Sequence, residues 1–180
     1  MQKTKALFLW LDLEMTGLDA EHDVILEIAA VITNTDLTEP IEGPDIVIHQ
    51  PKESLENLST WVQEQHTKSG LLERVTRSTI SVSEAEDAIL EFIAQHPAQE
   101  LYFAGNSIYQ DRTFLKKYMP RLNKKGHYRL VDVSTLKVLL QNWYPESPEI
   151  NFKKSKTHRA LTDIHESIEE LKHYKKYFFI

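Results

Sequence analysis

An apolar run near the start of the chain carries two acids, and this feature constrains the fold more than any other. Residues 6–11 are all apolar, and Asp12 and Glu14 follow before Gly17 ends the run. Residues i and i+2 of a β-strand point to the same face, so both carboxylates would project together from the end of a buried strand. Two such carboxylates repel each other and lose hydration, which favours a divalent cation between them. The alternative is that the strand has reached solvent and that both acids are surface residues.

Length and composition predict one domain that is soluble and cytoplasmic. The 180 residues are enough to bury a full core, so we expect a single domain over residues 1–180. Cysteine is absent, which excludes disulfides, thiolate zinc sites and a cysteine nucleophile. The first apolar run is too short for a signal peptide or a membrane span, so we expect no membrane partner. A net charge of −6 argues against strong non-specific affinity for duplex nucleic acid. A short nucleic-acid substrate is compatible with this charge.

The hydrophobic pattern predicts a mixed five-stranded sheet flanked by helices. Strands are expected in the opening run and in four later segments: 24–33, 45–49, 101–104 and 130–133. The first three would form an antiparallel meander, with Gly43-Pro44 as a break before the third. Apolar residues at helical spacing predict helices in five segments: 60–70, 83–96, 108–119, 136–143 and 159–178. Gly70 would end or kink the first helix, and Ser83 with Glu86 has the spacing of a capping box. This order of elements indicates an α/β fold.

Two further acids lie near the N-termini of two predicted helices. Asp111 falls in the first turn of the helix after the fourth strand, and Asp163 falls in the first turns of the last helix. Each alone is an ordinary acid at a helix N-terminus, where unsatisfied N–H groups favour negative charge. Ligand sites of α/β sheets form beyond the carboxyl ends of strands, however, and Asp12, Glu14 and Asp111 would gather at such an edge.

Four converging carboxylates with no cysteine predict a hard oxygen-ligand site suited to Mg²⁺ or Mn²⁺. Such a site can hold two ions bridged by one carboxylate, one activating water and the other stabilising the leaving 3′-oxygen at phosphorus. The reaction also needs a base near neutral pH, and His158, five residues before Asp163, is the candidate. The competing hypothesis is a non-catalytic α/β binding domain, in which the acids only cap helices and end strands and His158 is structural.

Three spaced motifs resemble those of a known group of enzymes: Asp12-x-Glu14-x-Thr16-Gly17-Leu18, Asn106-Ser107-x-x-x-Asp111 and His158-x-Ala160-x-x-Asp163. In this order they resemble the signature motifs of the DEDD exonuclease superfamily, and the histidine five residues before the last aspartate resembles its histidine subtype. The resemblance is closer still to the oligoribonuclease family within that superfamily. Members of this family are 3′→5′ exoribonucleases that cut short RNA oligomers and dinucleotides to mononucleotides.

The resemblance implies a ribonuclease-H-like exonuclease fold and an obligate homodimer. It also implies two Mg²⁺ or Mn²⁺ ions at Asp12, Glu14, Asp111 and Asp163, with His158 as general base. Leu18 would wedge between two bases, with Trp61 and His66 beside the nucleotide. Ser107 and Ser134 of the same chain would close the pocket over the 5′ end. Tyr128 and Arg129 of the partner subunit would complete this closure.

Physical reasons for the substrate contacts are weaker than those for the metal site. Apolar and aromatic side chains hold bases without reading them, and a guanidinium fits a terminal phosphate. The alternatives are that Leu18 and Trp61 belong to the core and that Tyr128-Arg129 is an exposed strand edge. An exonuclease for longer RNA or single-stranded DNA is the alternative within the same class, and the negative net charge argues against it.

Overall fold

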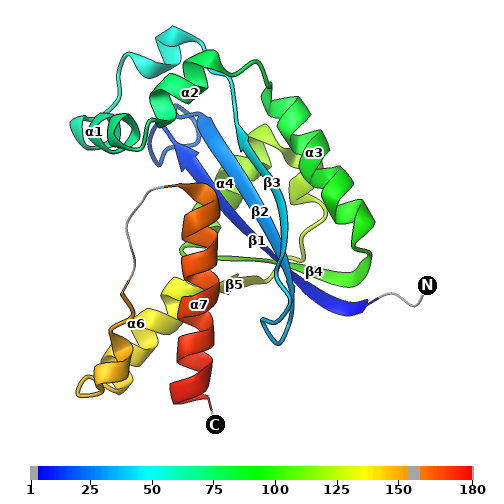
Figure 1. Ribbon diagram of the computed structural model, residues 1–180, viewed down its shortest axis with the longest axis vertical. Coiled ribbons are helices and arrows are strands. Elements are labelled where there is room, and N and C mark those ends of the chain that lie inside the picture. The colour runs from blue at the N-terminus through cyan, green and yellow to red at the C-terminus, as the bar shows by residue number, and fades with distance from the viewer. Residues whose placement is uncertain (1–3, 154–158, 180) are drawn as a thin grey trace.

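A mixed five-stranded sheet forms the centre of the structure, as the hydrophobic pattern predicts. The computed structural model describes residues 4–153 and 159–179. The strands lie in the order β3-β2-β1-β4-β5, with β2 antiparallel to both β1 and β3, and β4 parallel to both β1 and β5 (Figure 1). Their bounds are β1 Thr4–Met15, β2 Ile25–Asn34, β3 Ile41–Val47, β4 Ala98–Gly105 and β5 Leu130–Asp132.

Helices cover both faces of this sheet because the central strand is apolar on both sides. Leu9, Leu11 and other odd-numbered residues of β1 pack with α3 Val82–Gln95 and α4 Ile108–Tyr118. Trp10 faces the opposite side and packs with α6 Val133–Trp143 and α7 Ala160–Phe178. The alternation of a β-strand therefore sends Asp12 and Glu14, which share the parity of Trp10, to the α7 face.

The remaining helices are short and lie between the strands in the chain. They are the 3-10 helices η1 Lys52–Leu55 and η2 Pro148–Ile150 and the α-helices α1 Thr60–Lys68, α2 Leu71–Arg77 and α5 Pro120–Asn123. Ser59 caps α1 because its side chain accepts the N–H of Val62. Gly70 adopts a left-handed backbone with φ of 73° between α1 and α2, so the predicted break at this glycine is confirmed.

Two local predictions were wrong. The first placed a break at Gly43-Pro44, whereas β3 runs from Ile41 through both residues to Val47. The strand can contain a proline because β3 is an edge strand, and its pairing with β2 is irregular between Ala29 and Val31, opposite this dipeptide. No ladder hydrogen bond is therefore lost there.

The second wrong prediction concerned the start of α3. The capping box uses Ser81 and Glu84 rather than Ser83 and Glu86. Ser81 accepts the N–H of Glu84 at 3.3 Å, and the Glu84 carboxylate accepts the N–H of Ser81 at 2.8 Å. Glu86 is instead buried and accepts hydrogen bonds from the Arg121 side chain at 2.8 Å and the Leu122 N–H at 2.9 Å. Both spacings satisfy the motif, so tertiary partners decide between them.

In the part of the chain that the structure describes, no helix has the length and apolar character needed to cross a membrane.

Candidate active site

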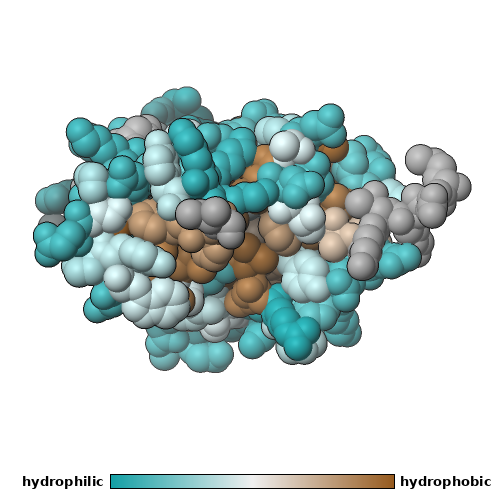
Figure 2. Space-filling model, turned by 90° about the horizontal axis from the view of Figure 1, so that it is seen from below, coloured by the Kyte–Doolittle hydropathy of each residue, from teal (hydrophilic) through white to brown (hydrophobic). Residues whose placement is uncertain are grey.

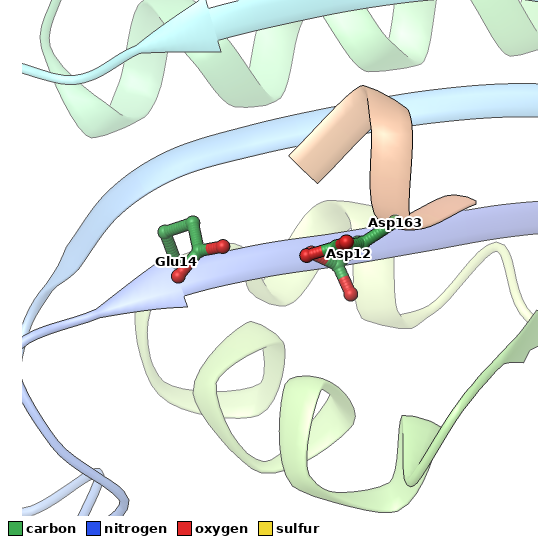
Figure 3. A group of neighbouring side chains, drawn as sticks. All are labelled: Asp12, Glu14 and Asp163. Atoms are coloured by element: carbon green, nitrogen blue, oxygen red, sulfur yellow. The ribbon is translucent and has the colours of Figure 1, made fainter. Parts of the chain in front are cut away.

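Three acids from two distant parts of the chain meet on the α7 face of the sheet. Asp12 and Glu14 project from the end of β1, and Asp163 lies in the first turn of α7. One carboxylate oxygen from each residue lies within 4.8 Å of those of the other two, and Figure 3 shows the Asp163 side chain reaching from α7 onto Asp12. The surface alternative predicted from the strand alone is therefore replaced by a compact carboxylate trio.

Small side chains allow α7 to approach the sheet this closely. Asp12 lies opposite Ala29 of β2 in the antiparallel ladder, and Ala29 is fully buried. Ala160, the first residue of α7, is fully buried as well. Methyl side chains at these positions leave room for the first helical turn beside β1, which brings Asp163 over the acids.

Asp111 lies at the same end of β1 but outside the trio. It is 6% exposed in the first turn of α4, and its Oδ1 accepts the backbone N–H of Leu13 at 2.9 Å. This bond joins the acid to the strand between Asp12 and Glu14. The structure therefore brings three of the four predicted ligands within ligand distance of each other and places the fourth directly behind them.

Burial and mutual repulsion make these carboxyls hold protons in the absence of a cation. Loss of water raises the pKa of Asp12 well above its usual value, and the charges of Asp111, Glu14 and Asp163 raise it further. The pKa of Glu14 rises to about 8, first through burial and then through Asp163 and Glu27. Burial likewise raises the pKa of Asp111 to about 7. Closely placed oxygen donors that resist ionising together fit a hard divalent cation, which would take the place of these protons.

The predicted general base cannot be placed in this geometry. His158 lies outside the described residues, and its role stays a prediction. Arg159, the next residue in the sequence, is described and is the residue before α7.

The loop that follows β1 exposes Leu18 to solvent, and hydrogen bonds from α4 fix the backbone of this loop. Leu18 is 71% exposed, so it does not pack on the core. Three side chains of α4 donate to loop carbonyls: Gln110 to Leu18, Lys117 to Ala20 at 2.7 Å and Tyr118 to Asp23 at 2.6 Å. The helix that carries Asp111 therefore also holds the Leu18 loop.

Gly17 is required for the shape of that loop. The Asp23 carboxylate accepts the Thr16 hydroxyl at 2.8 Å and the Asp19 N–H at 2.9 Å, and it lies directly over Gly17. A Cβ at Gly17 would collide with this carboxylate. The glycine of the first motif therefore permits a close approach of a side chain to the backbone.

Trp61 and His66 lie on the same helix but in different surroundings. Trp61 is 61% exposed and is not a core residue. His66 is buried, its Nε2 lies 3.0 Å from the carbonyl oxygen of Met15, and its Nδ1 lies 3.9 Å from Glu14. Because a carbonyl only accepts, Nε2 carries the proton in this bond. His66 thus supports the end of β1, and its predicted contact with a nucleotide stays a prediction.

Ser107 and Ser134 are adjacent at the N-termini of α4 and α6. The Ser107 hydroxyl donates to Ser134 Oγ at 3.2 Å, and the Ser134 hydroxyl donates to Asn106 Oδ1 at 3.0 Å. Asp132 accepts the N–H of both serines, at 3.0 and 2.9 Å. Ser107 itself has a φ of 53°, which is unusual for a residue with a side chain and marks backbone strain at this corner.

Tyr128 and Arg129 form a projecting aromatic and cationic group on another part of the surface. Tyr128 is 70% exposed, and the Arg129 guanidinium lies 4.7 Å from the centre of its ring. Arg112 of α4 donates to the carbonyls of His127 at 2.8 Å and Tyr128 at 3.0 Å, which fixes the backbone that carries them. Both residues precede β5, which begins at Leu130, so they are exposed but do not form the strand edge of the alternative reading.

Glu27 and Arg159 lie beside the trio, and neither was predicted from the sequence motifs as a site residue. Glu27 lies opposite Glu14 in the ladder between β1 and β2, has no exposed surface, and accepts the Arg159 guanidinium at 2.9 Å. The sequence signal for Glu27 is a lone charge inside the strand 25–33, whose other residues are apolar except Thr33. No local pattern marks Arg159.

Comparison with known proteins places this geometry in a family. The model of the Exonuclease family RNase_T matches residues 9–171. The oligoribonuclease of Paracidovorax citrulli is 49% identical over 181 residues, covering 100% of this chain and 93% of the relative. That of Pseudomonas aeruginosa PAO1 is 52% identical over 171 residues, covering 94% of each. The mitochondrial oligoribonuclease of Homo sapiens is 50% identical over 171 residues, covering 94% of this chain and 72% of the relative.

The chain belongs to the oligoribonuclease family. Solved structures of exonuclease I share its fold: one has a TM-score of 0.70 at 15% identity and covers 96% of this chain. The Escherichia coli exonuclease I in complex with a 5cy-dT13 oligonucleotide has a TM-score of 0.71 at 14% identity and covers 97% of this chain. This oligoribonuclease family member spans about 41% of the length of the exonuclease I chains. The predicted ribonuclease-H-like exonuclease fold, with a mixed sheet flanked by helices, is confirmed.

Proposed function

We propose that this chain is a 3′→5′ exoribonuclease that hydrolyses short oligoribonucleotides and dinucleotides to nucleoside 5′-monophosphates. The observation that carries the proposal is the half-buried carboxylate trio on a scaffold that is about half identical, over nearly its full length, to oligoribonucleases. Membership of an exonuclease family supports hydrolysis of a phosphodiester. The carboxylates of the trio would bind the divalent cations that assist such a hydrolysis.

The four acids are proposed to hold two ions of Mg²⁺ or Mn²⁺. Asp12, Glu14 and Asp163 offer oxygens within 4.8 Å of one another, and Asp111 accepts the N–H of Leu13, the residue between Asp12 and Glu14. Carboxylate oxygens suit these hard cations, and the trio contains no sulfur or imidazole donor that would favour zinc. When bound, the ions supply an activated water and Lewis-acid stabilisation of charge on the phosphoryl and leaving oxygens. The chain's part is to hold the acids in fixed positions, and the bound cations would keep them ionised.

His158 is proposed as the general base of the reaction. An imidazole with an ordinary pKa of about 6.5 is largely neutral at pH 7 and accepts the proton of the attacking water. The water oxygen bonds to phosphorus, the bond from phosphorus to the 3′-oxygen breaks, and the leaving 3′-oxygen takes up a proton. The proposal rests on the position of His158 in the third motif, five residues before Asp163.

The substrate pocket is proposed to fit two nucleotides. Leu18 and Trp61 are exposed apolar and aromatic side chains, as a wedge and a stacking surface require, and His66 lies beneath Glu14. Ser107 and Ser134 are proposed at the 5′ end. A net charge of −6 gives little general attraction for a long strand, so a few local contacts must provide the affinity.

An exposed apolar face supports the proposed homodimer. Figure 2, seen from below, shows hydrophobic residues gathered across the middle of this side, where α6 and the end of α7 lie in Figure 1. Val138 and Trp143 of α6 are 56% and 65% exposed, and Phe179 after α7 is 54% exposed. A gathered apolar surface of this kind typically marks a protein interface. We propose that a second copy binds on this face and that the partner subunit's Tyr128 and the partner subunit's Arg129 cap the pocket.

Mixed dimers test the cap. An Asp12→Asn variant keeps its cap but loses its metal site, and an Arg129→Gln variant keeps its metal site but loses the cap cation. If each cap serves the other subunit, mixing two nearly inactive variants restores one complete site per mixed dimer. Release of mononucleotide from a dinucleotide is therefore expected to rise at least several-fold over the sum of the separate variants. No recovery, with mixed dimers present by mass spectrometry, would contradict a cap in trans.

Turnover as a function of substrate length tests the proposed function. We expect kcat/KM to be highest for RNA of two to four nucleotides and to fall for longer RNA and for single-stranded DNA. The measurement uses a 5′-labelled length series with Mn²⁺, and chelator provides the control. A rate that rises steadily with length would indicate an exonuclease for longer strands, and no product under any metal would indicate a binding domain.

Two further expectations from the sequence are retained as proposals. We propose that residues 1–180 form a single exonuclease domain, because both cores share β1 and the family model matches 9–171. We also propose a cytoplasmic location, which agrees with a chain that contains no cysteine.

A further inference from the structure

Glu27 is a fully buried carboxylate that the proposed reaction does not use. It lies on β2 directly opposite Glu14 and on the same face of the sheet. Its two oxygens accept hydrogen bonds from Arg159 Nη2 at 2.9 Å and Nε at 3.2 Å and from the Ala160 N–H at 3.3 Å. Arg74 of α2 adds one bond at 3.3 Å. A buried carboxylate needs such partners, because an unpaired one is strongly unfavourable in the interior.

The partners of Glu27 show what this acid positions. Ala160 is the first residue of α7, and Asp163 follows within the same turn. A carboxylate on β2 that binds both the Arg159 side chain and the Ala160 N–H fixes where α7 starts relative to the sheet. Asp163 belongs to α7 whereas Asp12 and Glu14 belong to β1, so this link sets the distance between the two halves of the trio.

Glu27 also controls a cation that lies close to the trio. The charge of Arg159 acts on Glu14 and partly offsets the rise in the Glu14 pKa that burial and the neighbouring acids cause. In the structure the guanidinium is held by Glu27 on one side and lies 3.8 Å from Asp45 on the other. After Glu27, the carboxylates whose charges act on Arg159 are Asp45 and then Glu14. A guanidinium released from Glu27 therefore has Glu14 as its partner within the trio, and a planar bidentate donor is a strong competitor for carboxylate oxygens.

We propose that Glu27 is a positioning residue of the metal site, which anchors the start of α7 and keeps the Arg159 guanidinium away from the carboxylates of the trio. The inference rests on the proposed function, because it takes the trio to be the cation site. It assigns no contact with substrate to Glu27. Residues that orient metal ligands from behind typically contribute 10–100-fold to metal affinity, and Glu27 is expected to fall in this range.

Calorimetric titration with Mn²⁺ in the absence of RNA tests this role. Glu27→Gln keeps the shape of the side chain but removes its charge, and it is expected to weaken Mn²⁺ binding by about 10–100-fold. Arg74→Met is the matched control, because it removes the other arginine at Glu27 and leaves the link to α7 intact. Its affinity is expected to stay within about threefold of the parent. Parent-like Mn²⁺ affinity in folded Glu27→Gln protein would overturn the inference.

A double variant separates the two parts of the role. Glu27→Gln with Arg159→Met removes the Arg159 guanidinium together with the carboxylate it pairs with, and the remaining Arg74 side chain is 41% exposed. The double variant therefore also covers the case in which Glu27→Gln alone does not fold. Its Mn²⁺ affinity is expected to lie below that of the parent, because the anchor is lost, and above that of Glu27→Gln. Parent-like affinity would overturn the anchor, and an affinity no better than that of folded Glu27→Gln would overturn the competition by Arg159.

The parent protein distinguishes this inference from the proposed function. If the parent binds no Mn²⁺ in the titration and Asp163→Asn behaves identically, the proposed metal site fails. If the parent binds Mn²⁺, Asp163→Asn abolishes binding, and Glu27→Gln equals the parent, only the role of Glu27 fails. Circular dichroism of each variant at the titration temperature confirms that the compared proteins are folded.

Discussion

Asp12→Asn is expected to abolish mononucleotide release and at the same time to stabilise the metal-free protein. Burial of Asp12 and the charges of Asp111, Glu14 and Asp163 all oppose its ionisation, so the folded protein must either keep this carboxyl protonated or bear the repulsion. An amide of the same shape removes that cost but provides a poor ligand for a hard cation. The same change therefore has opposite effects on function and on stability.

The size of both effects follows from the energies involved. Ligated cations contribute several kcal/mol of transition-state stabilisation, so the rate is expected to fall by a factor on the order of a thousand or more. Relief of about 1–2 kcal/mol of this cost would raise the melting temperature in chelator by about 2–8 °C for a chain of this length. Saturating Mn²⁺ should stabilise the parent but leave Asp12→Asn unchanged, because the variant lacks the site through which binding shifts the unfolding equilibrium.

Asp36→Asn is the matched control for this change. The Asp36 side chain is 80% exposed, lies 3.7 Å from Lys175 and is not part of the trio, and the variant has the same net charge as Asp12→Asn. Its activity and melting temperature are expected to equal those of the parent within error, since exposed ion pairs contribute little. Thermal melts with and without Mn²⁺, together with product release, provide the measurement. A fall in the stability of metal-free Asp12→Asn would show that repulsion is not the dominant interaction in the trio.

The acids could be predicted from the sequence because their positions depend on local periodicity. Asp12 and Glu14 share a face by strand alternation, and Asp163 follows a helix start that the apolar stripe of the last helix reveals. The order of strands and helices then indicated that these segments meet at one edge of the sheet. Spacing alone placed Asp111 among them, whereas the structure places it behind the trio, bonded to the Leu13 N–H.

The supports of the site could not be predicted because their partners are distant in the chain. Glu27 and Arg159 are 132 residues apart, and Tyr118 reaches across 95 residues to the loop of Leu18. No local pattern encodes such a pair, since each member is compatible with an ordinary surface position. The capping box was wrongly predicted for the same reason, because Glu86 pairs with Arg121, a residue distant in the sequence. Metal ligands whose positions depend on one strand or helix can be predicted from the sequence. Contacts that position them across two distant elements can be identified only from the three-dimensional structure.

The metal-free protein is expected to lose stability as the pH rises from about 5 to about 8. Glu14 has a pKa of about 8 in the folded protein against an ordinary value of 4.5, and Asp111 has a pKa of about 7 against 3.8. The folded state therefore keeps protons that the unfolded chain has already released. Stability from these groups is fully present below the unfolded pKa values and is lost as the pH rises through the folded ones. A shift of this size at Glu14 corresponds to several kcal/mol, a large part of the stability of a typical domain.

A bound cation should reverse this dependence, because it replaces the protons. Mn²⁺ affinity is expected to rise with pH up to about pH 8, and binding at pH 6 should release protons, which calorimetry in two buffers of different ionisation enthalpy measures directly. Glu14→Gln removes one titrating group, so its metal-free stability should fall less steeply with pH than that of the parent. Urea melts from pH 5 to pH 8 in chelator provide the comparison. If the parent were equally stable throughout, or gained stability with pH, the carboxyls of the site would be ionised without a cation, and repulsion could not be what drives metal binding.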